Sequence, residues 1–312
     1  MKKLIVLAMI MAVIVLVAAL VRAQGPANDL KPTFISPTPG LYVSGWPAFT
    51  VSYPKEWVEL VRGPVAVFAA GAARADVPPN MGLPMLAIDV FPSTDALEDW
   101  AEHYMHFWVM IATDVKVLSD KPSRLKDGTL AREQELEWVI KNGPKANVFQ
   151  FMTKRESTWV AVILMAAEGK LGADVKSIAY SLTFQPDREK PVQVPPDVRA
   201  FLDMFCADRV SVDVTAVMEH YSDRFLNSGM SQAVIERASR DYDPTFPSFA
   251  PHRGIISQEA TVTVFEAHGD KAYVDGFFLV KAKGDATALK EPMRFQQIIN
   301  EHGEWKWFGN QR

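Results

Sequence analysis

The sequence predicts an α+β protein of two domains, each built on an antiparallel sheet. The chain has 312 residues, of which 48% are apolar and 22% charged, which suffices for two compact domains of roughly 150 residues each. Alternating apolar runs joined by short turns, such as Asn142-Gly143, are typical of antiparallel hairpins. A proline-rich linker, residues 185–197, separates the two domains, and its stiffness is expected to hold them apart.

Residues 1–23 have the pattern of an export signal. A basic start precedes an apolar run from Leu4 to Val21, and Ala23 supplies the small residue needed for cleavage before Gln24. An uncleaved membrane anchor is the alternative, because 18 apolar residues approach the roughly 20 that cross a bilayer. Both interpretations place the rest of the chain outside the cytoplasm, in the periplasm or the extracellular space. Residues 24–40 contain four prolines and are expected to form an extended tether.

Residues 41–184 are expected to form the first domain. Alternation of apolar and polar residues predicts strands over residues 49–53, 65–69, 85–91, 130–140, 146–154 and 159–165. Helical spacing of apolar residues predicts helices over 95–111 and 173–182. Helices before and after a mostly antiparallel sheet indicate a layered α+β domain.

Residues 198–312 are expected to form the second domain, with helices first and a sheet after them. Apolar stripes predict helices over 198–205, 214–225 and 233–242. Strands are predicted over residues 259–267, 271–283, 292–299 and 305–309, with turns at His268-Gly269-Asp270 and His302-Gly303.

Two family resemblances rest on short segments. The segments FTVSYPKEW, MLAIDVFPS, WVAVILMAA and SIAYSLTF, in this order, resemble the PsbP-like fold, an α-β-α sandwich, over residues 41–184. The segments HYSDRFLNSG, expected on the second helix, and GEWKWFGN, expected as the last strand, resemble the nuclear transport factor 2-like (SnoaL-like) cone fold over about residues 197–312.

The resemblances imply different things about function. The PsbP-like resemblance implies a non-catalytic assembly or binding protein. The cone resemblance implies a curved antiparallel sheet around a long helix, with a pocket at the open end. Its family includes isomerases, cyclases and dehydratases as well as binding and dimerisation modules. The fold class expected for the whole chain is therefore an antiparallel-sheet α-β-α sandwich followed by a curved-sheet α+β cone.

Asp275 is the strongest candidate for a catalytic group. It is the one charged residue in the interior of an apolar strand, and alternation places it on the same face as Tyr273 and Phe277. Desolvation among aromatic rings would raise the pKa of the carboxyl, as a general base acting near neutral pH requires. The alternative is an ion pair with Arg294 on the next predicted strand, because buried charges are normally paired.

Two tyrosines complete the candidate pocket. Tyr221 lies on the apolar stripe of the second predicted helix, where its hydroxyl could donate a hydrogen bond to a ligand carbonyl, or could belong to an ordinary core tyrosine. The ketosteroid isomerase branch of the cone family implies such a tyrosine with a carboxylate. Tyr242 is expected at the pocket mouth, with Tyr273, Phe277 and Arg294 as further lining. His220 and Asp223 lie off the stripe and are expected to face solvent.

Other chemistries find little support in the sequence. Asp99, Glu102, His103 and His106 share one helix face and could bind zinc or copper. A charged face opposite an apolar one is, however, the ordinary pattern of an amphipathic helix, so no metal site is predicted. Motifs for cofactors and for common nucleophiles are absent, and no cofactor is expected. The single cysteine, Cys206, excludes an internal disulfide, and a net charge of -4 disfavours nucleic acid as a partner.

These observations predict an exported, non-enzymatic accessory protein. Its cone domain would bind a small apolar ligand or an extracytoplasmic protein. The alternative is a cone-fold enzyme of the isomerase or dehydratase type, with Asp275 as base and Tyr221 as hydrogen-bond donor to a small carbonyl compound. A third interpretation makes the cone sheet the interface of a homodimer.

Overall fold

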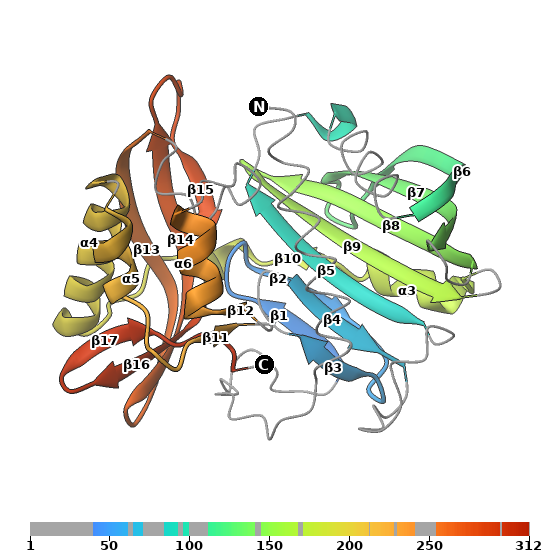
Figure 1. Ribbon diagram of the computed structural model, residues 1–312. Helices are drawn as coiled ribbons and strands as arrows, with labels where there is room; N and C mark the ends of the chain where they lie inside the picture. The colour runs from blue at the N-terminus through green and yellow to red at the C-terminus, as the bar shows by residue number, and fades with distance from the viewer. Residues whose placement is uncertain are drawn as a thin grey trace.

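The computed structural model describes residues 40–61, 65–70, 84–92, 96–99, 112–140, 145–167, 171–211, 213–227, 230–240, 254–293 and 295–311. The predicted signal and nearly all of the predicted tether lie outside these ranges. The architecture is α+β, as predicted, and two hydrophobic cores define two units (Figure 1). The first unit draws its core from residues between Tyr42 and Phe184, and the second from residues between Val198 and Trp307. No helix in the described ranges is long and apolar enough to cross a membrane.

A seven-stranded antiparallel sheet dominates the first unit, in the order β3-β4-β5-β9-β8-β7-β6. The strands are β3 (Val58–Val61), β4 (Val65–Ala69), β5 (Met85–Pro92), β6 (Ala112–Arg124), β7 (Leu130–Ile140), β8 (Lys145–Arg155) and β9 (Thr158–Ala167). The sequence predicted five of these seven strands, and the hairpin expected at Asn142-Gly143 joins β7 to β8. It missed the two edge strands, β3 and β6. Most of β6 lies at the surface, so its sequence shows no clear alternation of apolar and polar residues. It also contains Pro122, and a proline argues against a strand interior.

One face of this sheet is covered by a small sheet and a helix. The small sheet has the order β1-β2-β10, from β1 (Leu41–Ser44), β2 (Phe49–Ser52) and β10 (Thr183–Phe184). The helix is α3 (Ala173–Tyr180), close to its predicted range. Apolar side chains of β2, α3 and the large sheet meet in one core, including Phe49, Phe149, Phe151 and Ile178. Of the predicted helix over 95–111, the structure describes residues 96–99, and residues 97–99 are helical.

The second unit packs helices against a five-stranded antiparallel sheet. Its order is β13-β14-β16-β17, and β15 also pairs with β14. The strands are β13 (Ile255–His268), β14 (Lys271–Ala282), β15 (Leu289–Pro292), β16 (Gln297–Glu301) and β17 (Glu304–Trp307). A separate two-stranded sheet pairs β11 (Leu226–Asn227) with β12 (Met230–Ser231). The helices are α4 (Pro196–Ser211), α5 (Val214–Glu219) and α6 (Gln232–Arg240), and a 3-10 turn, η1 (Pro186–Glu189), precedes them.

Two predicted elements of the second unit differ from the structure. The helix predicted over 214–225 ends at Glu219, because β17 binds the next residues: the Trp307 N–H donates to the His220 carbonyl (2.8 Å), and the Trp307 carbonyl accepts from the Ser222 N–H (3.0 Å). His220 was predicted to face solvent, and this prediction is wrong: its Nε2 lies 2.7 Å from an Asp208 carboxylate oxygen. The strand predicted over 292–299 is two strands, β15 and β16, which pair with different parts of β14.

The proline-rich linker does not hold the two units apart. Glu189 of η1 accepts a hydrogen bond from the Ala48 N–H (3.1 Å) in the turn between β1 and β2. A few residues later, the Val192 N–H donates to the Val262 carbonyl of β13 (2.9 Å). The linker therefore binds both units, and the units are in direct contact beside it, with hairpin β1–β2 at the boundary (Figure 1).

Candidate functional site

The two faces of β14 have different surroundings. Side chains alternate along a strand, and Val274 and Phe278 join the core formed with the helices. Tyr273, Asp275 and Phe277 therefore point to the opposite face, called here the outer face of the second sheet. This outer face contacts the turn between β1 and β2, residues 45–48. The first unit therefore covers Asp275, the strongest catalytic candidate from the sequence.

Asp275 is buried at this contact, with 1% of its surface exposed. Its Oδ1 accepts from the Gly276 N–H (2.7 Å), and its Oδ2 accepts from Gln296 Nε2 (3.0 Å) and from the Tyr273 hydroxyl (3.3 Å). The Gly45 N–H also bonds to the carboxylate. Burial raises the pKa of Asp275 to about 7, although these hydrogen bonds act in the opposite direction. The donors named here are all neutral; Arg294, the predicted ion-pair partner, lies outside the described residues.

Gly45 brings its backbone into contact with the carboxylate. A Cβ atom at this position would lie 2.6 Å from Asp275 Cγ and still closer to Oδ2, so no other residue type fits without movement. The Gly45 carbonyl accepts a hydrogen bond from the Thr263 hydroxyl of β13 (3.3 Å). Both backbone polar groups of Gly45 are therefore bound by side chains of the second unit.

The residues after Gly45 extend the contact. The Trp46–Pro47 peptide bond is cis. The Trp46 ring packs on Phe277 with ring centroids 4.7 Å apart. The Lys290 ammonium of β15 lies 5.0 Å from the Phe277 centroid and 5.9 Å from that of Trp46, within the range of cation–π attraction. Phe277, predicted to line a ligand pocket, is thus covered by a tryptophan of the same chain.

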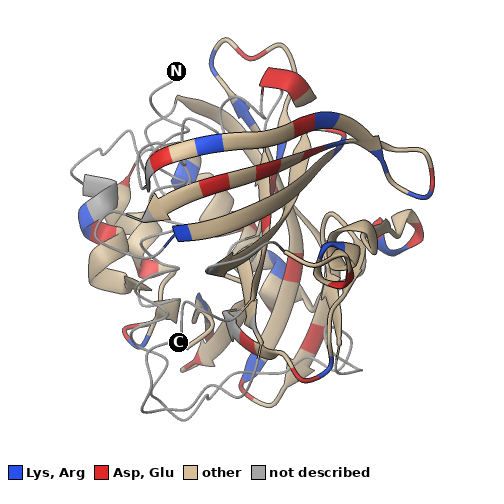
Figure 2. Cartoon of the chain, turned by 90° about the vertical axis from the view of Figure 1, so that its right-hand side faces the viewer, with Lys and Arg blue, Asp and Glu red and all other residues tan. Residues whose placement is uncertain are grey.

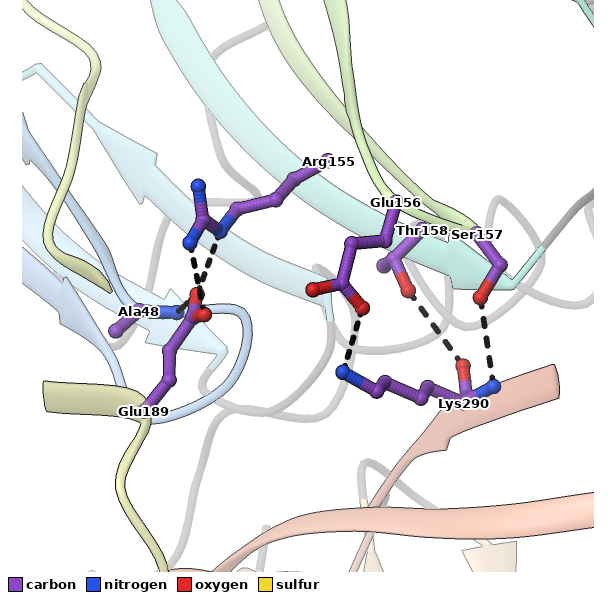
Figure 3. Close-up of polar contacts among 7 residues, drawn as sticks. All are labelled: Ala48, Arg155, Glu156, Ser157, Thr158, Glu189 and Lys290. Atoms are coloured by element: carbon purple, nitrogen blue, oxygen red, sulfur yellow. Dashed lines mark hydrogen bonds and ion pairs between the residues drawn. The ribbon is translucent and has the colours of Figure 1, made fainter. Parts of the chain in front are cut away.

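Two polar clusters flank this contact (Figure 3). In the first, Lys290 binds the turn between β8 and β9: its ammonium lies 2.5 Å from a Glu156 carboxylate oxygen, its N–H donates to Ser157 Oγ (3.4 Å), and its carbonyl accepts from the Thr158 hydroxyl (3.5 Å). In the second, the Arg155 guanidinium donates twice to the Glu189 carboxylate (2.9 and 3.0 Å). Glu189 thereby fixes the linker to β8 as well as to the turn at Ala48.

Tyr221 lies on the other side of the second sheet from Asp275. It is 4% exposed and belongs to the helix-side core, where its ring contacts Phe225, Phe295 and Phe205 at centroid distances of 5.1, 5.6 and 6.3 Å. Burial raises the pKa of the Tyr221 hydroxyl above its ordinary value. The structure therefore does not bring the two predicted catalytic side chains together.

The remaining predicted site residues are only partly described. Tyr273 is buried beside Asp275 on the outer face, whereas Tyr242 lies outside the described residues. The predicted metal-type face retains only Asp99, which is exposed. In the described part of the chain, no group of three or more His, Cys, Asp or Glu side chains is placed to hold a metal ion.

The contact of the 45–48 turn with the outer face, together with its two flanking polar clusters, is called here the joint. Sequence reasoning missed the residues that make it. They are Gly45, Trp46, Glu156, Glu189 and Lys290, and none of them lies in a motif with an assigned chemistry. The available signal was a Gly-Trp-Pro turn after an apolar strand, because a glycine there can mark a close approach of two backbones or of a backbone and a side chain. Chemically, the joint holds a backbone segment and a carboxylate in fixed register; it does not present a reactive atom to solvent.

Comparisons with known proteins assign no family to the chain. No family model matches it, and no curated protein is similar enough to match. Among solved structures, it is similar to cyanobacterial PsbP (CyanoP) from Synechocystis sp. PCC 6803, at 13% identity and a TM-score of 0.37, covering 52% of this chain and 100% of that one. It is similar to a structure from Bacteroides thetaiotaomicron VPI-5482 at 11% identity and a TM-score of 0.34, covering 86% and 89%. A STAR-related lipid transfer protein from Xanthomonas axonopodis matches at 11% identity and a TM-score of 0.25, covering 40% and 92%.

Proposed function

We propose that this chain is an exported, non-enzymatic accessory protein whose two units act as one body and bind a small apolar ligand or another extracytoplasmic protein. The observation that carries the proposal is the burial of Asp275 by the Gly45 backbone. A general base must reach the proton that it abstracts, directly or through one water. Asp275 instead accepts hydrogen bonds from its own chain on both oxygens.

The alternative, a cone-fold enzyme, lacks its pair of groups. Its mechanism needs Asp275 and Tyr221 around one substrate, yet these side chains belong to opposite faces of the sheet. The buried Tyr221 ring is surrounded by other aromatic rings, which is the ordinary position of a core tyrosine. The PsbP-like and cone-like resemblances of the two units remain part of the proposal, as does export by residues 1–23.

Native mass spectrometry of the protein secreted by a bacterial host tests the binding function. Under the proposal, the mature chain begins at Gln24 and carries a retained small-molecule mass or a co-purifying protein. A chain that retains residues 1–23 and stays in the membrane fraction would support the uncleaved membrane anchor instead of a cleaved signal. An isolated chain with no retained mass, in every preparation, would count against a tightly bound ligand and leave protein binding to be tested by crosslinking in the host.

Turnover of small carbonyl compounds tests the enzyme alternative. The wild-type protein and the Asp275→Asn variant are compared on isomerisation and dehydration of a substrate panel. The proposal expects no difference between them above the uncatalysed rate. Turnover by the wild type that disappears in Asp275→Asn, with the variant still folded by circular dichroism, would overturn the non-enzymatic assignment.

A further inference from the structure

The helix side of the second sheet is fully covered along most of β14 but only partly covered at one end. Val274 and Phe278 are at most 5% exposed, whereas Val280, two residues further along the same face, is partly exposed. Ala260, which lies opposite Phe278 on β13, is partly exposed as well. At this end, the apolar face between the helices and the sheet is therefore accessible from solvent.

Arg209 of α4 lies at the same end. Its guanidinium carbon is 5.8 Å from the ring centroids of both Phe205 and Phe278. With 6% of its surface exposed, it is the one buried lysine or arginine among the described residues. Other basic positions are partly or fully exposed, as on the outer strands of the first sheet, where they are interleaved with acidic positions (Figure 2). A buried charge is costly unless it is paired and hydrogen-bonded, so the partners of Arg209 decide what it can do.

The described chain uses little of the hydrogen-bonding capacity of Arg209. A guanidinium carries five N–H donors. Arg209 has an ion pair with Glu291 of β15, with Nη2 and Oε2 3.5 Å apart, but its side chain makes no hydrogen bond within the described residues. Glu291 lies opposite Phe278, so its side chain is on the helix side, and it is 14% exposed. Arg209 therefore has donors left for a further acceptor.

Gln258 supplies an unused acceptor on the other side of β14. It lies opposite Val280 and points to the helix side, where its Nε2 donates to Cys206 Sγ (3.5 Å). Its Oε1 is buried and has no hydrogen-bond partner in the described part of the chain. Cys206 is three residues before Arg209 on α4, so the two side chains are neighbours on one helix face. Buried polar atoms are nearly always paired, and the unused groups of Gln258 and Arg209 together indicate a missing polar partner.

We propose that this end of the second unit binds an apolar molecule with an uncharged polar head, the head lying among Arg209, Glu291 and Gln258 and the apolar chain over β14. The head must accept a hydrogen bond from Arg209 and donate one to Gln258 Oε1, as an amide or an alcohol does. Arg209 and Glu291 already neutralise each other, so a charged head would leave one charge unbalanced in a buried place. This inference rests on the ligand-binding part of the proposed function and specifies the class of ligand.

Calorimetric titration with three compounds of the same chain length tests the class of head group. At neutral pH, octanamide carries an uncharged head that accepts and donates hydrogen bonds, octanoate carries an anion and octylammonium a cation. Octanamide should bind with a dissociation constant at least about tenfold lower than that of either ion. Equal affinity for the three compounds, or tighter binding of either ion, would overturn the assignment of an uncharged head.

Gln258→Met and Arg209→Lys test the location. Met removes the unpaired oxygen, so octanamide binding should weaken about fivefold, while the urea midpoint of unfolding stays the same or rises. Lys keeps the charge beside Glu291 but loses the planar set of donors, and it should weaken binding by a similar factor. Gln232→Met is the matched control, because the Gln232 amide donates to the Met218 carbonyl (3.4 Å). It should leave the dissociation constant unchanged.

Two results would overturn the inference. One is wild-type affinity for octanamide in both Gln258→Met and Arg209→Lys, which would place the ligand elsewhere. The other is no binding of octanamide to the wild-type protein. Native mass spectrometry distinguishes this failure from a failure of the proposed function, because it detects a retained mass whatever its head group. A protein that retains a mass but does not bind octanamide would contradict the site at Arg209 and leave the proposed function in place.

Discussion

The two faces of the second sheet are both buried, but they are built in different ways. The helix side is a cluster of rings, where Tyr221, Phe225 and Phe295 contact one another edge to face at centroid distances of 5.1–5.6 Å. The outer face holds a carboxylate, and the first unit contacts it through the backbone of Gly45. Rings can adjust to a change in one neighbour, whereas a backbone hydrogen bond to a buried carboxylate needs one geometry. Substitutions that add or remove only one or a few atoms should therefore have larger effects on the outer face than on the helix side.

Gly45→Ala is the strongest test of this difference. The added Cβ overlaps the Asp275 carboxylate, so the turn must move and break the hydrogen bonds of both groups. We expect a loss of more than about 3 kcal/mol in the free energy of unfolding, measured with urea. Gly128→Ala is the control, because no atom lies within 4 Å of its Cβ position. Alanine at this position is strained only by the positive φ of 88°, so we expect a cost of about 1 kcal/mol. Equal losses in the two variants would mean that the turn is not seated on Asp275.

The ionisation of Asp275 should give the stability a distinct dependence on pH. Burial raises its pKa to about 7 in the folded protein, from an ordinary value of 3.8. Between these values the folded state binds more protons than the unfolded state, so this group's contribution is fully present below about pH 4 and is lost as the pH rises toward 7. The total change is about 4 kcal/mol.

Asp275→Asn isolates this contribution. Asn cannot ionise, and its amide group faces hydrogen-bond donors, so we expect lower stability at acidic pH by about 1–3 kcal/mol. The difference in unfolding free energy between wild type and variant should then shrink, or reverse, from pH 4 to pH 8. Parallel curves over this range would contradict the assignment of a raised pKa to Asp275.

The contrast between the faces also explains what the sequence could predict. β7 and β14 were predicted almost to the residue, because alternation is a property of neighbouring residues. Helical periodicity likewise predicted the buried face of α4, which includes Phe201 and Phe205. The joint depends on contacts such as Thr263 with Gly45, which are 218 residues apart, and no local pattern reports them. Sequence reasoning identified Asp275 as unusual, but it could not show that a turn of the first unit covers it.

Lys290→Met should have an intermediate effect at the joint. It keeps the apolar stem but removes the charge that lies over Phe277 and Trp46 and beside Glu156. We expect a loss of about 1–2 kcal/mol in unfolding free energy. Glu156→Gln should cost less, within about 1 kcal/mol, because the Glu156 side chain is 54% exposed and its ion pair is screened by solvent. If the two variants cost the same, and the double variant no more than either, the ring contacts of Lys290 contribute nothing measurable.

Tyr221→Phe should have the smallest effect, since it removes one oxygen from the helix-side face. The contacts that hold Tyr221 are made by its ring, which the substitution leaves in place. Within the described residues its hydroxyl makes no hydrogen bond, so we expect the unfolding free energy to stay within about 0.5 kcal/mol of the wild type. Tyr221→Ala, by contrast, should cost about 3–5 kcal/mol, as the loss of a buried ring usually does. A large loss in Tyr221→Phe would show that the hydroxyl has a partner in the folded protein, and the helix-side face would then depend on polar geometry as the outer face does.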